Sequence, residues 1–68
     1  MMPSPDVATV AGAKQRLGNL GYFQGKQGDE IDPSFRDALR SFQQDHELKP
    51  TGELDAATIA KLQDAHGH

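Results

Sequence analysis

Residues 31–42, with the sequence IDPSFRDALRSF, carry the strongest helix signal in this chain. Asp32 can accept hydrogen bonds from the unpaired backbone amides at a helix start, and Pro33 suits the first helical position because no donor is needed there. The apolar residues that follow recur at spacings of four and three, so they share one helical face. They are Phe35, Leu39 and Phe42. The sequence therefore predicts a central helix over residues 33–46, against which the rest of the chain packs.

The start of this helix has a copy downstream. Each copy contains an apolar residue, an aspartate, and a leucine seven positions after the aspartate. The copies read Ile31-Asp32-x-x-Phe35-x-x-x-Leu39, after Gly28, and Leu54-Asp55-x-x-Thr58-x-x-x-Leu62, after Gly52. We interpret both as one turn, cap and helix unit, in which the aspartates are helix caps and not catalysts. The second copy predicts a helix over residues 56–65.

A first helix is predicted over residues 5–19, where apolar residues again follow helical spacing. Ser4 before Pro5 is its expected N-cap. Gly21 is the expected terminator, because glycine readily adopts the left-handed conformation that ends many helices. The polar side of this helix is expected to carry Lys14, Gln15 and Arg16.

The expected fold class is all-α: a small three-helix bundle with an internal helix pseudo-repeat, since no strand-like alternation of useful length occurs. One domain is expected over residues 7–65, between a flexible N-terminal segment at 1–6 and a flexible tail at 66–68. Its core is expected to combine large apolar side chains from all three helices. These are Leu17, Leu20, Phe35, Leu39, Phe42, Ile59 and Leu62.

The composition argues against several classes of protein. A chain of 68 residues, 35% of them hydrophobic, can build only one small core. A net charge of −3 with both signs interspersed argues against non-specific nucleic-acid binding. No apolar run reaches membrane-spanning length, and the N-terminus lacks the pattern of a signal peptide. We therefore expect no nucleic-acid partner and no membrane insertion.

The residue types of catalytic and metal sites occur without the spacing that such sites need. The chain has no cysteine and no HExxH motif. The histidines are His46, His66 and His68. Ser4, Ser34 and Ser41 lie at predicted helix starts or on a helix surface, and none is in a glycine-bounded nucleophile turn. We expect no enzyme activity, no metal and no cofactor.

An ordered set of motifs extends from about Val7 to Leu62. It comprises Leu17-x-x-Leu20-Gly21-Tyr22, Gly25, Ile31-Asp32, Ala38-Leu39-x-x-Phe42-Gln43 and Leu48-x-x-Thr51-Gly52-x-Leu54-Asp55-x-x-Thr58-x-x-x-Leu62. This set resembles the peptidoglycan-binding-domain-like family, whose members are three-helix modules often appended to cell-wall hydrolases. Phe35 stands where the family commonly has threonine. The propeptide branch of the family uses a cysteine to block zinc, so the absence of cysteine excludes that branch.

The resemblance implies a non-catalytic cell-wall (peptidoglycan) binding module that tethers a linked or associated protein to the bacterial wall. The implied partners are peptidoglycan fragments (stem peptide or glycan), with a hydrolase, effector, or secretion or phage component attached. We expect a monomer in the periplasm, in the cell wall, or secreted or injected. The alternative is a protein-interaction or structural module of a bacterial secretion or phage particle with the same fold.

The ligand is expected at the helix ends and loops, where polar side chains and an aromatic ring converge. The expected contacts are Tyr22, Arg40, Gln44 and Lys49. Arg40 lies one helical turn before Gln44 on the same face, and its cation suits the carboxylates of stem peptides. The Tyr22 ring could instead be partly buried, with its hydroxyl at the wet boundary.

Two residues that adjoin these expected contacts in the sequence are expected to have structural roles. Phe23 is expected to plug the core beneath the loop that follows the first helix. Gln43 could bind a stem peptide, but a glutamine at such a position more often satisfies the backbone groups of an adjacent turn. We expect that structural role for Gln43.

Overall fold

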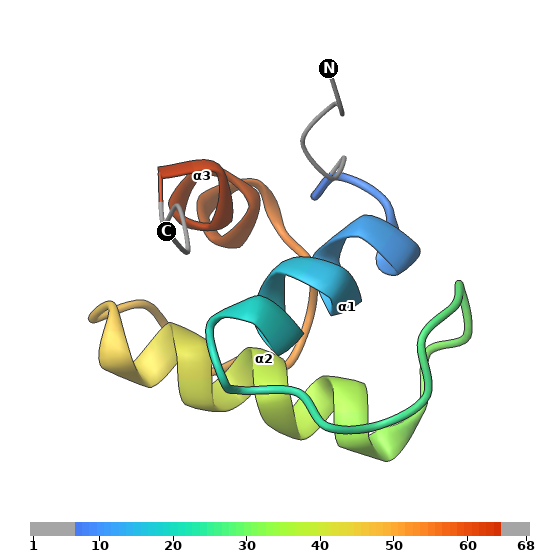
Figure 1. Cartoon of the computed structure of the whole chain (residues 1–68). Helices are drawn as coiled ribbons and strands as arrows, with labels where there is room; N and C mark the ends of the chain where they lie inside the picture. The colour runs from blue at the N-terminus through green and yellow to red at the C-terminus, as the bar shows by residue number, and fades with distance from the viewer. Residues whose placement is uncertain (1–6, 65–68) are drawn as a thin grey trace.

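The computed structural model describes residues 7–64, which form three α-helices (Figure 1). They are α1 (Val10–Asn19), α2 (Pro33–Asp45) and α3 (Ala56–Asp64). The all-α fold and the second and third helices are as predicted, and no strand occurs within the described part. The predicted segments at 1–6 and 66–68, and the last residue of the predicted third helix, lie outside it.

The first helix lies between the other two and packs against both (Figure 1). It begins later than predicted, at Val10 and not at residue 5. Thr9 is its N-cap: the Thr9 side chain accepts a hydrogen bond from the Gly12 amide at 3.1 Å. Because this bond satisfies a backbone amide of the first turn, the helix begins five residues downstream of the predicted start. The predicted N-cap Ser4 lies outside the described residues.

Both predicted aspartate caps are confirmed. Asp32 Oδ1 accepts from the Phe35 amide at 2.8 Å. Asp55 Oδ1 accepts from both the amide and the hydroxyl of Thr58, at 2.9 and 2.7 Å. The two copies of the pseudo-repeat thus start their helices with the same physical device.

The core forms where the three helices meet. Five of the seven predicted core residues are buried: Leu17, Phe35, Leu39, Phe42 and Leu62. Leu20 and Ile59 are only half-buried and pack against the edge of this cluster. Val7 is also buried, although it precedes α1. Its apolar side chain belongs to the core without belonging to the helix, so the helical spacing of apolar residues extended the predicted helix too far.

The predicted polar side of α1 is wrong for two of its three residues. Lys14 is fully buried and Arg16 nearly so, whereas Gln15 is exposed. Lys14 Nζ lies 3.5 Å from Asp32 Oδ2 and within 6 Å of the ring centroids of Phe23 and Phe35. The periodicity indicated one apolar stripe, but α1 is covered on two sides, so its polar flank is buried and the lysine carbons pack in the interior.

The predicted structural role of Gln43 is confirmed. Its side chain is fully buried, and the amide nitrogen lies 2.8 Å from Thr58 Oγ1 and 3.0 Å from Thr51 Oγ1. The same nitrogen is 3.0 Å from the backbone oxygen of Glu53, and Gln43 Oε1 accepts from the Gly52 amide at 3.0 Å. One amide therefore joins α2, the return loop and α3.

Replacing Gln43 by leucine should lower the free energy of unfolding by about 3 kcal/mol, because four hydrogen bonds are lost and the buried Gly52 amide is left without its acceptor. Chemical denaturation measures this directly. The matched control is Gln44→Leu at the next, exposed position, which should cost under about 0.5 kcal/mol. Equal losses in both variants would contradict the assigned role of Gln43.

Stability should also fall at acid pH because of the two caps. The Phe35 amide, and more weakly Lys14, hold the pKa of Asp32 below its usual 3.8. The hydroxyl and amide of Thr58 hold the pKa of Asp55 below the same value. Since each pKa is lower in the folded state, this stabilisation is complete above 3.8 and is lost as the pH falls through the folded-state values.

Denaturation midpoints measured from neutral pH to below 3.8 test this expectation. Asp55→Asn retains a capping oxygen but cannot titrate, so it should lose less stability on acidification than the parent chain. Parallel acid dependence of the two proteins would count against it.

Candidate ligand-binding groove

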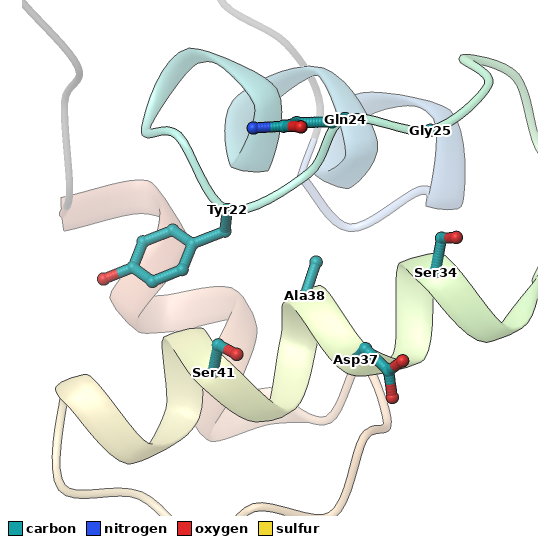
Figure 2. Close-up of a pocket in the computed structure, with 7 residues that line it drawn as sticks. All are labelled: Tyr22, Gln24, Gly25, Ser34, Asp37, Ala38 and Ser41. Carbon is teal, nitrogen blue, oxygen red and sulfur yellow. The ribbon is translucent and has the colours of Figure 1, made fainter.

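A polar groove of about 360 Å³ lies between α2 and the segment that follows α1 (Figure 2). Tyr22 and Ser41 lie at one end of it, and Ser34 lies at the other end. The complete lining is Tyr22, Gln24, Gly25, Ser34, Asp37, Ala38 and Ser41. The four helical positions share one face of α2 because they are three or four residues apart.

The wall opposite α2 is held in place by Phe23, which plugs the core as predicted. Phe23 is buried and meets the Phe35 ring edge-on, with the ring centroids 6.4 Å apart. Gly25 lies directly over the Phe23 ring: a Cβ at this position would be 2.8 Å from Phe23 Cζ. This close approach favours glycine, and it brings residue 25 against Ser34 at one end of the groove.

Tyr22 is positioned by the end of α1. Gly21, the predicted terminator, has a left-handed φ of 91°, and the next amide, that of Tyr22, donates to the Leu17 carbonyl at 2.8 Å. The half-buried Tyr22 ring meets Phe42 edge-on, at 5.5 Å between centroids. Its hydroxyl donates to Asp45 Oδ2 at 2.6 Å. The backbone amide and the hydroxyl of Tyr22 are therefore both hydrogen-bonded, and they hold the ring at the groove.

The hydrogen bond to Asp45 raises the pKa of Tyr22 to about 12, with smaller contributions from burial and from the negative charge of Asp45. All three causes favour the neutral phenol, because the phenolate would lose the bond and face a carboxylate. Tyr22 is thus a neutral, hydrogen-bonded wall residue at neutral pH.

The other expected contacts lie outside the groove. Arg40 is exposed, and its Nη1 lies 2.8 Å from Oδ1 of Asp37, which lines the groove. The Arg40 side chain otherwise lies against Gly52 and lines a separate hollow with Arg36 and Pro33, so it meets the groove only through its ion pair with Asp37. Gln44 and Lys49 are both exposed and do not line the groove. The structure brings Tyr22 and, through Asp37, Arg40 to one place.

Sequence reasoning missed four other polar side chains that line the groove. Ser34, Asp37 and Ser41 recur on one face of α2, and Gln24 faces them from the opposite wall. The spacing of short polar residues was readable in the sequence. The segment that faces them was not, because the sequence does not show which face of α2 the segment around Phe23 packs against.

A second hollow of about 420 Å³ lies at the other flank of α2 and is more apolar. The buried side chains of Phe35 and Leu39 contribute to it, with Val10, Leu54 and Ile31 around them. Ile31 is 56% exposed, and within residues 7–64 it is the one large hydrophobic side chain that is exposed.

Within residues 7–64 no group of three or more metal-ligating side chains occurs, and no helix is long and apolar enough to cross a membrane. His46 packs on Phe42, with 4.2 Å between the ring centroids. His66 and His68 lie outside the described residues.

Residues 7–64 thus form a three-helix scaffold with a capped pseudo-repeat and a shallow polar groove. Residues 6–62 match the model of the family described as "Putative peptidoglycan binding domain". Since the match covers most of the chain, the chain belongs to this family.

The chain is also similar to the localization factor PodJL of Caulobacter vibrioides, as found in strains NA1000 / CB15N and ATCC 19089 / CIP 103742 / CB 15. In both strains the identity is 37% over 60 residues, which is 88% of this chain and 6% of PodJL. The chain thus spans a small part of the length of the curated relatives that it matches. No solved structure matches it.

The ionisation of Tyr22 offers a direct test of the groove geometry, because the chain has one tyrosine. The ultraviolet absorbance of phenolate should rise near pH 12 and not near 10, and Asp45→Asn should move this rise toward 10. Since the pKa is higher in the folded state, stability should decline as the pH rises from 10 to 12. A parent chain that ionises near 10 would show that the bond to Asp45 is absent.

Proposed function

We propose that this domain is a non-catalytic module that binds peptidoglycan and tethers a linked or associated protein to the bacterial cell wall. The observation that carries this proposal is the groove itself, in which an aromatic ring, hydroxyls, an amide and a carboxylate face one open channel. Membership of a peptidoglycan-binding family supports it. Binding would act by raising the local concentration of the attached protein at the wall.

The contacts we propose begin with Tyr22 in the groove and include Arg40, which reaches the groove through its ion pair with Asp37. Gln44 and Lys49 lie further along, at and beyond the end of α2, and would meet parts of the ligand that extend past the groove. The groove is shallow and its side chains are exposed, so one module should bind weakly, with a dissociation constant on the order of millimolar. Several modules or a linked partner would be needed for firm attachment.

The setting that fits this function is the periplasm, the cell wall or the exterior of a bacterium. The relative PodJL is named a localization factor, and anchoring to a wall is one physical means of fixing a protein in place. A chain attached to this module would inherit its position from the polymer.

A second function, docking onto another protein, is favoured by one observation. Ile31 is 56% exposed at the edge of the apolar hollow. In the second copy of the pseudo-repeat, Leu54 precedes the cap and Ile59 occupies the fourth helical position; both are partly buried against the core. In the first copy that fourth position is Arg36, so Ile31 lacks an apolar counterpart. An apolar side chain of a partner could cover it.

Sedimentation with purified sacculi tests the main proposal. Tyr22→Ala should reduce binding by about fivefold, the value of one aromatic contact of about 1 kcal/mol. Arg40→Ala should reduce binding less, because an exposed charge contributes little. Lys61→Ala is the matched control for Arg40, since Lys61 is exposed on α3 and lines neither hollow.

The unfolding midpoint of each variant should be recorded beside its binding, so that loss of fold is not mistaken for loss of contact. A parent domain that stays in the supernatant would overturn the proposal. If Ile31→Ser then abolished capture by a protein partner, the docking function would replace it.

A further inference from the structure

We infer that the groove is built for the glycan strand of peptidoglycan and not for the stem peptide. This inference rests on the proposed function and names the part of the polymer that the groove selects. It follows from three properties of the lining: its unused hydrogen-bonding groups, its charge, and its length beside an aromatic ring.

Three polar side chains of the groove are available to a ligand. Within residues 7–64, no hydrogen bond occupies the side chains of Gln24, Ser34 or Ser41. Two hydroxyls and one amide can both donate and accept, which matches the hydroxyl and acetamido groups of N-acetylated amino sugars. All three side chains are uncharged, so a sugar can bind to them without the cost of desolvating a charge.

The charge of the groove opposes an anionic ligand. No lysine or arginine lines it, and its one ionic group is the carboxylate of Asp37. Arg40 is paired with Oδ1 of that carboxylate. Near Tyr22, Asp45 accepts a hydrogen bond from the Tyr22 hydroxyl. A stem-peptide carboxylate would thus find no cation in the lining of the groove and would approach the carboxylates of Asp37 and Asp45, of which Asp37 is paired with a cation. The glycan backbone, with its lactyl groups in amide linkage, is neutral.

The shape of the groove fits a short stretch of sugar rings. Ser34 and Ser41 are seven residues apart on α2, which corresponds to about 10 Å of helix axis. That is long enough for a disaccharide unit. Ala38 keeps the channel open between the two serines. Gly25 lies over Ser34 at one end, and Tyr22 adds an aromatic surface at the other end (Figure 2). Sugar rings commonly place their apolar faces against such rings, since these combine an apolar face with a polar edge.

In this arrangement the stem peptide leaves the groove over its rim. There it would pass the exposed side of α2, where Arg40 lies. The groove accounts for recognition of the glycan, and the rim accounts for any contribution from the peptide.

The test is titration of the isotope-labelled domain with three soluble probes, followed by amide chemical shifts. The probes are chitotetraose, a tetramer of N-acetylglucosamine without peptide; a free stem pentapeptide; and a disaccharide carrying that pentapeptide. Chitotetraose and the disaccharide-peptide should shift the amides of Tyr22, Gln24 and Gly25 and of the groove face of α2. The free pentapeptide should leave these amides unchanged at the same millimolar concentration.

A variant that fills the groove with a larger side chain tests where the sugar binds. Ser41→Leu places a large side chain in the channel and should weaken chitotetraose binding by about tenfold or more. Its matched control is Ala60→Leu, which adds the same side chain at an exposed position of α3 outside the groove and should leave binding unchanged. Both variants are checked for an unchanged unfolding midpoint.

A charge variant separates the two ligand classes further. Asp37→Asn keeps an acceptor for sugar hydroxyls, removes the negative charge, and frees Arg40 from its partner. Chitotetraose affinity should therefore change by less than about twofold, while affinity for the free pentapeptide should rise. An unchanged response to the pentapeptide would contradict the electrostatic part of the inference.

The outcomes separate the glycan inference from the proposed function of peptidoglycan binding. If the free pentapeptide shifts the groove amides and chitotetraose does not, the glycan assignment is overturned and peptidoglycan binding stands. Chitotetraose shifts centred on Ile31 would overturn it as well, because they would place the sugar in the other hollow. If none of the three probes causes shifts in a folded domain that also fails to bind sacculi, both proposals fail.

Discussion

The buried amide of Gln43 is the constraint on which the C-terminal half of this domain depends. Its nitrogen and oxygen satisfy groups from the return loop and from Thr58 on α3, all within 3.0 Å. A chain of this size has too few apolar side chains to hold a loop and a short helix by burial alone. A buried polar group is costly when unpaired, so it accepts only one arrangement of its neighbours. Gln43 thereby adds specificity of packing where the hydrophobic core is small.

The N-terminal half is held by the corresponding device at the other end of α2. Lys14 reaches from α1 between two aromatic rings to the cap residue Asp32, so a single cation contacts the core and the helix start together. The pseudo-repeat has the same caps in both copies but different anchors. Phe35 fills the core in the first copy, and Thr58 completes a polar network in the second. The two halves are therefore alike in backbone and unlike in chemistry.

The groove is a consequence of these anchors. Phe23 enters the core beside Phe35, and Gly25 passes over its ring at a distance that no side chain would allow. The segment between them is thus held along α2, a short distance from the small residue Ala38. Tyr22, tied to Asp45, closes one end. The candidate groove, with the free side chains of Gln24, Ser34 and Ser41, thus lies on a frame held by buried aromatic packing and by the bond between Tyr22 and Asp45, which is the preorganisation that a weak site would need.

Local interactions explain what could be predicted from residue order. Aspartate caps at Asp32 and Asp55, proline at a helix start and apolar spacing act within four residues, so the sequence states them directly. Thr9 escaped notice because an earlier serine and proline offered an equally good cap on paper. The burial of Lys14 and the set of side chains facing Tyr22 depend on which faces meet in three dimensions. Those features were decided by the tertiary structure, since a pattern along one helix cannot show how many neighbours will cover it.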